Sequence, residues 1–483
     1  MNLETAKISE IVNSVQSNKI SAAEVMQFFL QRARQWQDKT NAIITFNPEA
    51  EAQAAKLDAA IAKGEQVGPL AGIPVVVKDL LCTKNLKTTA GSKILDNFVP
   101  PYSSTVVERL ENAGAIVLGK ANLDEFAMGS SNETSYYGNV KNPWSLEHVP
   151  GGSSGGSAAA AAARMAPLAI GTDTGGSIRQ PASFCNVVGL KPTYGRVSRY
   201  GIVAYASSLD QAGPMANYIE DVALALEVIG GKDPRDMTSA NQAVPQFSNI
   251  QKEVKGLKIG LPKEYFGEAL SSEVRSICEE SIAKLKSAGA EFVDVEIPHL
   301  DYTIATYYII ATSEASSNLA RYDGVRYGHR SEDAKTLEDL YCNTRAEGFG
   351  EEVKRRIMLG TYSLSSGYYD AYYLKACKVR RLLQNDFLKA FEKVDLLLSP
   401  VTTSAAFKVG ERISDPLEMY LNDIYTTSTN LAGLPGMSVP AGFSSAGLPI
   451  GVQLTAPHFA EDRLFQVGKV IQDMQNVADR RPQ

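Results

Sequence analysis

The chain has 483 residues, 44% of them hydrophobic and 21% charged, which is typical of a globular protein and excludes disordered and fibrous classes. Its formal net charge of -6 excludes a basic surface that grips a nucleic-acid backbone, so any nucleic acid would be held mainly by another chain. The five cysteines form no CxxC pair, which argues against a zinc site or a disulfide framework and favours a reducing compartment.

The N-terminal part of the chain is predicted to be helical. Its first residues, MNLETAKISEIVNS, are acidic where a signal peptide would be basic, so we expect a cytoplasmic protein without a membrane segment. The capping box SAAE at residues 21–24 opens a helix to about residue 36, and an alanine-rich helix is predicted over residues 48–63. These helices would form an outer layer over about residues 1–65.

Strands and helices alternate after this layer. The run LAGIPVVVKDLL, from residue 70, is typical of a strand buried on both faces, with Lys78 at its end. Residues 104–112 are predicted to form a helix and residues 115–119 the next strand. The pattern predicts an α/β protein with a central mixed β-sheet covered by helices on both faces. We expect a single domain over residues 1–483, with its core at about 70–215.

The same alternation predicts the remaining elements. The predicted helices cover residues 158–165, 223–229, 272–286 and 353–391, and the predicted strands cover residues 168–170, 187–190, 257–261, 292–297 and 394–398. Residues 230–251, rich in Asp, Ser, Pro and Asn, are predicted to form a long surface loop or a weak domain boundary.

Two Gly-Gly-Ser turns, at residues 151–153 and 175–177, flank the predicted alanine-rich helix and a short strand. Glycine before serine lets the backbone bend sharply and exposes N–H groups and a hydroxyl, which suits nucleophilic catalysis. The segment GGSSG matches the G-x-S-x-G nucleophile elbow, and His458 lies downstream as that scheme requires, but LEHVP precedes it where an apolar strand is needed. Neither turn has the Gly-Lys-Ser/Thr ending of a phosphate loop. The Ser-x-x-Lys at residues 281–284 lies on a charged amphipathic helix, which favours a solvated surface.

Lys78 offers a different base. A free lysine with a pKa of about 10.4 is almost always protonated at pH 7, so it can act as a base only where burial or nearby positive charge lowers that pKa. The end of a buried strand provides such burial. The alternative is a lysine that extends its ammonium to solvent or forms an ion pair, with Asp79 as the candidate partner.

Three segments in order, GIPVVVKDLL, GGSSGGSAAAAAA and GTDTGGSIRQPASFCNVVGLKPTYGRVS, resemble the amidase signature family, whose members hydrolyse amide bonds with a Ser-Ser-Lys triad. The resemblance implies that Ser177 is the acylated nucleophile, Ser153 the bridging serine next to a cis peptide bond, and Lys78 the terminal base. A relay from serine through serine to a neutral lysine would need no histidine. The resemblance further implies an oxyanion hole from the backbone of Thr174, Gly175, Gly176 and Ser177.

Segments outside this core, such as NLDEFAMGSSNETSYYGNVKNPW and MYLNDIYTTSTNLAGLPGMSVPAG, are similar to the branch of the family that supplies ammonia from glutamine to tRNA-dependent amidotransferases. That branch implies that Arg356 binds the α-carboxylate of glutamine and Asp423 its α-ammonium. The neighbouring Arg355 remains an alternative for the carboxylate. The resemblance implies that the pocket is also lined by Tyr307, Met128, Gly129 and Ser130.

The same branch implies a heterotrimer. A B subunit would bind the tRNA and use ATP and magnesium to activate tRNA-linked glutamate, and a small C subunit would wrap around both, so this chain would need no cofactor or metal. Ammonia would convert Glu-tRNA(Gln) to Gln-tRNA(Gln), and the sequence leaves open whether Asp-tRNA(Asn) is also an acceptor. Two alternatives are a stand-alone amidase acting on aryl or aliphatic amides and a non-catalytic scaffold. The intact triad residues argue against the scaffold.

Overall fold

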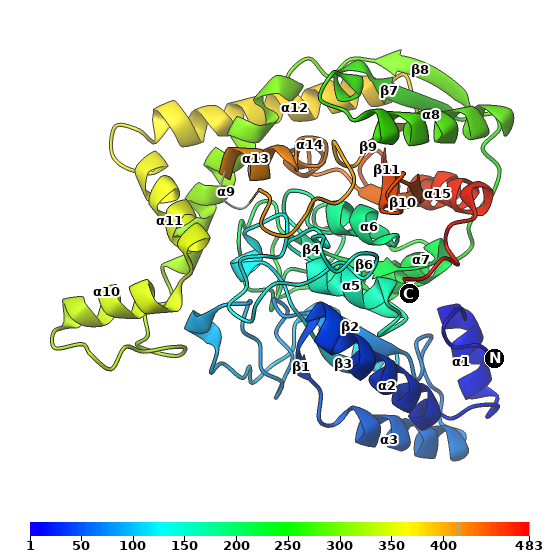
Figure 1. Ribbon diagram of the computed structural model, residues 1–483, viewed down its shortest axis with the longest axis horizontal. Coiled ribbons are helices and arrows are strands. Elements are labelled where there is room, and N and C mark those ends of the chain that lie inside the picture. The colour runs from blue at the N-terminus through cyan, green and yellow to red at the C-terminus, as the bar shows by residue number, and fades with distance from the viewer. Residues whose placement is uncertain (413–415, 483) are drawn as a thin grey trace.

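The computed structural model describes residues 1–412 and 416–482 (Figure 1). Within these residues, eleven strands form one sheet that contains both parallel and antiparallel pairs, which confirms the predicted mixed sheet. In sheet order the strands are β1 (Ile43–Phe46), β3 (Ile116–Ala121), β2 (Pro74–Lys78), β4 (Leu168–Asp173), β6 (Gln211–Ala216), β5 (Val188–Lys191), β10 (Gly436–Phe443), β11 (Pro449–Thr455), β9 (Leu396–Pro400), β7 (Lys258–Pro262) and β8 (Glu291–Val295).

Helices pack on both faces of this sheet, as predicted. Helices α5 (Gly155–Ala162) and α6 (Arg179–Cys185) contact each other and the central strands. Helices α4 (Thr105–Asn112), α7 (Ile219–Ile229), α15 (Glu461–Gln475) and α8 (Ser272–Ser287) form a separate contacting row against the same sheet. The N-terminal helices are α1 (Ile8–Gln16), α2 (Ala22–Thr40) and α3 (Ala50–Ala62), of which α2 and α3 lie beside β1, β2 and β3 (Figure 1).

A second group of helices lies around the carboxyl-terminal half of the chain. Helix α9 (Thr303–Leu319) packs along α11 (Glu351–Ser363) and α12 (Lys375–Phe391), while α10 (Leu337–Gly348) extends away from the sheet (Figure 1). Short helices α13 (Pro416–Leu421) and α14 (Thr427–Leu431) precede β10. No helix in the described part of the chain is both long enough and apolar enough to span a membrane.

Strand β2 shows why the first motif folds as it does. It lies between the parallel strands β3 and β4, and all five of its residues are buried, as its run of valines predicts. Helix α5 also packs closely against its neighbours. A Cβ on Gly156 would lie only 2.4 Å from the backbone oxygen of Asn122. Glycine at this position therefore lets the helix lie directly against the backbone that follows β3.

The prediction of continuous helix over residues 353–391 was wrong. Helix α11 ends at Ser363, and a π-helical turn (Asp370–Leu374) leads into α12. Strands β6 and β10 gave no clear signal because they contain glycine and proline, and Pro440 lies at a register shift where its missing N–H does no harm. Residues 231–251 form neither helix nor strand, which confirms the predicted loop.

Candidate active site

Lys78 lies at the carboxyl end of β2 and is completely buried. Its Nζ lies 2.9 Å from the Oγ of Ser153, 2.9 Å from the Oγ of Ser154 and 2.9 Å from the Oγ1 of Thr172. The ammonium is not paired with the neighbouring Asp79, whose carboxylate lies 3.1 Å from Lys120 instead. The ion-pair alternative for Lys78 was therefore wrong, and three hydroxyls surround its amine.

Burial also decides the charge of Lys78. Loss of water around the ammonium lowers its pKa to about 7, although three buried carboxylates oppose the shift, those of Asp124, Asp173 and Asp210. A substantial fraction of the side chain is therefore neutral near pH 7. A neutral amine that contacts a serine hydroxyl can accept a proton from it.

The two serines of the motif differ in access to solvent. Ser153 is 0% exposed and follows a cis peptide bond with Gly152, whereas Ser177 is 8% exposed. The Ser154 N–H donates to the backbone oxygen of Ser177 at 3.2 Å, which holds the two turns together. No hydrogen bond joins the two Oγ atoms in the described structure. Catalytic hydrogen bonds are commonly long before substrate binds, and only Ser177 is accessible to a substrate.

Asp173 organises the turn that carries Ser177. Its carboxylate accepts the N–H of Gly176 at 2.8 Å and that of Ile178 at 3.2 Å, and it lies 3.0 Å from Arg179 Nε. Burial alone would raise the pKa of Asp173, but the Arg179 guanidinium outweighs this effect and holds that pKa at about 2. The turn is thus wrapped around a permanently charged carboxylate. Sequence reasoning missed this role, because nothing in the spacing indicates where the Asp173 side chain points.

One of the predicted oxyanion-hole donors, the N–H of Gly176, already has a hydrogen-bond partner. That N–H donates to Asp173, and the Thr174 hydroxyl donates to Asp210 at 2.7 Å. The N–H groups of Gly175 and Ser177 donate to no other group in the described residues. The Thr174 bond uses only its hydroxyl, and its backbone N–H likewise has no partner in the described residues, so the predicted donors left free to stabilise a developing oxyanion are the N–H groups of Thr174, Gly175 and Ser177.

Both glycines of this turn are required by close contacts. A Cβ on Gly175 would lie 2.6 Å from the hydroxyl of Tyr307, and a Cβ on Gly176 would lie 2.2 Å from Thr426 Oγ1. Gly176 also has a φ of +138°, which side chains disfavour. Tyr307 is buried and packs against Gly175, which places this predicted pocket residue at the oxyanion turn.

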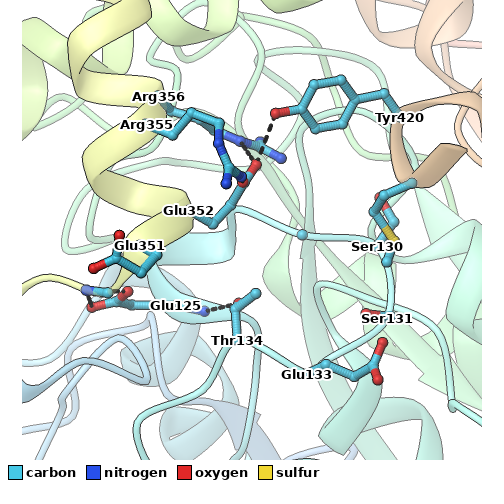
Figure 2. Close-up of a pocket in the computed structure, with 13 residues that line it drawn as sticks. Glu125, Ser130, Ser131, Glu133, Thr134, Glu351, Glu352, Arg355, Arg356 and Tyr420 are labelled. Atoms are coloured by element: carbon cyan, nitrogen blue, oxygen red, sulfur yellow. Dashed lines mark hydrogen bonds and ion pairs between the residues drawn. The ribbon is translucent and has the colours of Figure 1, made fainter. Parts of the chain in front are cut away.

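A pocket of about 260 Å³ lies between helix α11 and the loop of Ser130, a size suited to a small molecule. Figure 2 shows one wall formed by the arginines and glutamates of α11 and the opposite wall formed by the loop of Ser130, Ser131 and Glu133. The triad residues do not line this pocket. The Gln180 side chain links the two regions, since it donates to the backbone oxygen of Ser130 and accepts from the N–H of Gly152, both at 2.9 Å.

The two candidate arginines have different environments. Arg356 is 2% exposed, donates from Nε to Glu352 at 2.8 Å and from a terminal nitrogen to the Tyr205 hydroxyl at 2.8 Å. The Arg355 side chain is 47% exposed and pairs with the other oxygen of Glu352. Arg356 is therefore held rigidly, with donors left for a ligand, whereas Arg355 lies at the solvent-facing rim of the pocket.

Asp423 and Ser130 lie in direct contact. The Ser130 hydroxyl donates to the Asp423 carboxylate at 2.6 Å, and burial raises the pKa of Asp423 to about 7. Thr426 joins this group to the oxyanion turn, because its hydroxyl donates to the backbone oxygen of Gly175 at 2.6 Å. Met128 is buried, and Gly129 packs against Asp124, where a Cβ would lie 2.3 Å from the carboxyl carbon.

Sequence reasoning missed several residues that shape the site. Ser154 and Thr172 hold the Lys78 amine, Asp210 holds Thr174, and Tyr205 holds Arg356. These side chains come from loops and strands whose positions depend on the whole fold, so no local pattern indicates them. Among the described residues, no group of three or more His, Cys, Asp or Glu side chains is arranged to hold a metal ion.

Comparison with known proteins gives consistent matches over the whole chain. The family described as Amidase matches residues 24–465. The A subunit of a glutamyl-tRNA(Gln) amidotransferase from Bdellovibrio bacteriovorus is 59% identical over 487 residues, covering 100% of this chain and 99% of the relative. The protein of that name from Alkalilimnicola ehrlichii is 55% identical over 478 residues, covering 99% of this chain and 98% of the relative.

Solved structures agree in fold. The crystal structure of the A subunit of a glutamyl-tRNA(Gln) amidotransferase from Thermotoga maritima is 40% identical, has a TM-score of 0.82 and covers 100% of this chain and 98% of its own. A native peptide amidase from Stenotrophomonas maltophilia is 30% identical, has a TM-score of 0.83 and covers 99% of this chain and 98% of its own. The same fold therefore occurs in proteins named for different amide substrates.

Proposed function

The chain belongs to the amidase family, and on this premise we propose that it hydrolyses glutamine to glutamate and ammonia as the glutaminase subunit of a tRNA-dependent amidotransferase. The observation that carries the proposal is the contact of 2.9 Å between buried Lys78 and Ser153, in a turn that the Ser154 N–H joins to the more accessible Ser177. The names of the relatives, at 55% identity and above over nearly the whole chain, support the choice of glutamine.

The proposed reaction has two halves. Ser177 Oγ attacks the side-chain carbonyl carbon of glutamine, and its proton passes through Ser153 to the neutral Lys78 amine. The N–H groups of Gly175 and Ser177 stabilise the oxyanion. The tetrahedral intermediate then collapses: the C–N bond breaks, and the proton held by Lys78 returns to the leaving nitrogen, which departs as ammonia. Water attacks the remaining ester by the same route, releasing glutamate and restoring the Ser177 hydroxyl.

Arg356 and Asp423 would select an amino acid over a simple amide. The guanidinium is fixed by Glu352 and Tyr205 and can bind a carboxylate through two parallel hydrogen bonds. The Asp423 carboxylate provides a negative charge for the α-ammonium. Residues 128–130 and Tyr307 would enclose the chain of the substrate between these charges and Ser177.

Replacing Arg356 with lysine should raise KM for glutamine roughly tenfold to a hundredfold, because a bidentate charged contact is lost while the positive charge remains. Lysine keeps a positive charge beside the Glu352 oxygen that Arg356 contacts. The matched control is Arg355→Lys, which changes a neighbouring exposed residue and should leave KM within about twofold. Steady-state glutaminase kinetics measure both. A larger effect at Arg355 than at Arg356 would reverse this assignment.

The pH dependence of kcat should report the ionisation of Lys78. We expect kcat to rise with pH through about 7 and then level off, because only the neutral amine accepts a proton. One unit below that pKa only about a tenth of the enzyme carries the neutral amine, so kcat should be roughly tenfold lower. The measurement is made at saturating glutamine, where kcat reflects the enzyme–substrate complex rather than the ionisation of Asp423 in the free enzyme. A flat profile across this range would argue against Lys78 as the base.

The proposal also assigns partners. Ammonia would pass to a B subunit that binds the tRNA and uses ATP and magnesium to activate the tRNA-linked carboxylate, with a C subunit completing a heterotrimer. The net charge of -6 on this chain is compatible with tRNA held elsewhere. The B subunit would decide between Glu-tRNA(Gln) and Asp-tRNA(Asn). Since aminoacyl-tRNAs are used in the cytoplasm, the proposal implies a cytoplasmic enzyme.

One assay separates this function from that of a stand-alone amidase. The chain is co-expressed with its partner subunits, and hydrolysis of glutamine and of a hydrophobic aryl amide is measured with and without tRNA and ATP. We expect glutamine hydrolysis to rise when the tRNA and ATP are added, with little turnover of the aryl amide. Robust aryl amide hydrolysis by the chain alone, with none of glutamine, would favour the stand-alone amidase.

A further inference from the structure

The hydroxyl of Tyr308 is buried and has no hydrogen-bond partner within the protein. Two neighbouring tyrosines contrast with it. The Tyr205 hydroxyl accepts from Arg356 at 2.8 Å, and the Tyr420 hydroxyl donates to Glu352 at 3.0 Å. Buried hydroxyls in folded proteins are nearly always paired, because an unpaired one loses its bonds to water without replacement. An unpaired hydroxyl in this position calls for an explanation.

The ring of Tyr308 lies among the residues that form the proposed α-carboxylate site. It stacks on the ring of Tyr420 with centroids 3.9 Å apart and planes at 25°. The guanidinium carbon of Arg356 lies 5.2 Å from the Tyr308 ring centroid and 5.3 Å from that of Tyr420. Both Arg356 and Tyr420 line the pocket. The stacked pair therefore forms an aromatic support for the guanidinium, and one of its two rings carries the unpaired hydroxyl.

The chemistry of this hydroxyl favours an anion. Burial raises the pKa of Tyr308 well above the ordinary value, so the group keeps its proton at neutral pH and can donate it in a hydrogen bond. The Arg356 guanidinium beside it attracts negative charge. A carboxylate bound to Arg356 would supply the acceptor that Tyr308 lacks.

We propose that Tyr308 is a specificity-determining residue whose hydroxyl donates a hydrogen bond to the α-carboxylate of the substrate held by Arg356. This inference rests on the proposed glutaminase function and deepens it. In the free protein the unpaired hydroxyl has a free-energy cost, and this cost is removed when a ligand with a carboxylate binds. A substrate without that carboxylate would leave the hydroxyl buried and unpaired, so the site rejects it.

The test is Tyr308→Phe in the Ser177→Ala background, where glutamine can bind without turnover. The ligands are glutamine and the analogue that lacks the α-carboxylate, and binding is measured by calorimetry and by the shift in unfolding temperature of the full chain. We expect the phenylalanine variant to bind glutamine at least about tenfold more weakly, with no change for the analogue. Its unfolding temperature without ligand should be unchanged or higher, because an unpaired hydroxyl has been removed. The matched control is Tyr302→Phe, which removes an exposed hydroxyl beside the start of α9.

The outcomes separate this inference from the proposed function. If the parent Ser177→Ala chain does not bind glutamine and the wild-type chain, assembled with its partner subunits, does not hydrolyse it, the proposed function fails. If the parent binds glutamine and Tyr308→Phe binds it equally well, the role of Tyr308 is wrong. Equal losses for glutamine and the analogue, or a lower unfolding temperature without ligand, would indicate a purely structural role and overturn the inference.

Discussion

Replacing Ser177 with alanine is expected to reduce kcat for glutamine hydrolysis by at least about ten-thousandfold, as loss of a nucleophile does in other acyl-transfer enzymes. Alanine removes one oxygen from a turn that is otherwise held by Asp173 and by the Ser154 N–H, so the fold should be unaffected. Glutamine binding should persist, because Arg356 and Asp423 are untouched. Release of ammonia and direct binding of glutamine measure the two effects separately.

The partner reaction provides a control for this variant. In the assembled complex, amidation driven by added ammonia should continue at the wild-type rate, while amidation driven by glutamine should stop. A second control is Ser208→Ala, which changes a partly exposed serine outside both the triad and the pocket. If Ser177→Ala retained glutamine-dependent amidation, Ser177 would not be the nucleophile.

Replacing Lys78 with alanine is expected to lower kcat by about a thousandfold or more and to change the affinity for glutamine little. The base acts in the transition state, so its loss affects turnover more than binding. The amine contacts Ser153, Ser154 and Thr172 but lies outside the pocket that holds the substrate charges. Single-turnover kinetics and equilibrium binding on the same preparation measure the two effects.

Lys191 offers a matched control for Lys78. It is also buried, and burial likewise lowers its pKa to about 7, but its Nζ donates to the backbone oxygen of Pro192 at 2.9 Å and makes no hydrogen bond to a serine in the described residues. Lys191→Met should leave kcat per folded molecule within a few-fold of the wild type. If both lysine variants lost activity equally, or if Lys78→Ala kept its turnover, a proton relay specific to Lys78 would be untenable.

Much of the core could be predicted from local patterns. The valine run of β2 is typical of a strand that is covered on both faces. The alanine run of α5 is typical of a helix that packs closely against backbone. The two Gly-Gly-Ser turns flanking α5 were also recognisable, because glycine before serine lets the backbone bend sharply. Strand β10 was not, because its glycines and Pro440 are tolerated only through pairing with strands distant in sequence.

The site was predictable only in part. The resemblance of the motifs that carry Lys78, Ser153 and Ser177 to the amidase signature family implied an amidase, but no sequence pattern could reveal that Asp173 occupies the Gly176 N–H or that Tyr308 lacks a partner. Such facts depend on where side chains from several elements meet. The choice between Arg355 and Arg356 is similar, because both lie on one turn of helix and only burial separates them.

The most direct test of the account is covalent labelling with a glutamine analogue that carries a diazoketone in place of the carboxamide. The reagent retains the α-carboxylate and α-ammonium that Arg356 and Asp423 would bind, and it alkylates the nucleophile it is presented to. Mass spectrometry of peptides from the labelled chain should find the adduct on Ser177, with protection by excess glutamine and no labelling of Lys78→Ala. An adduct on Ser153 or elsewhere, or no adduct on a chain that hydrolyses glutamine, would contradict the assignment.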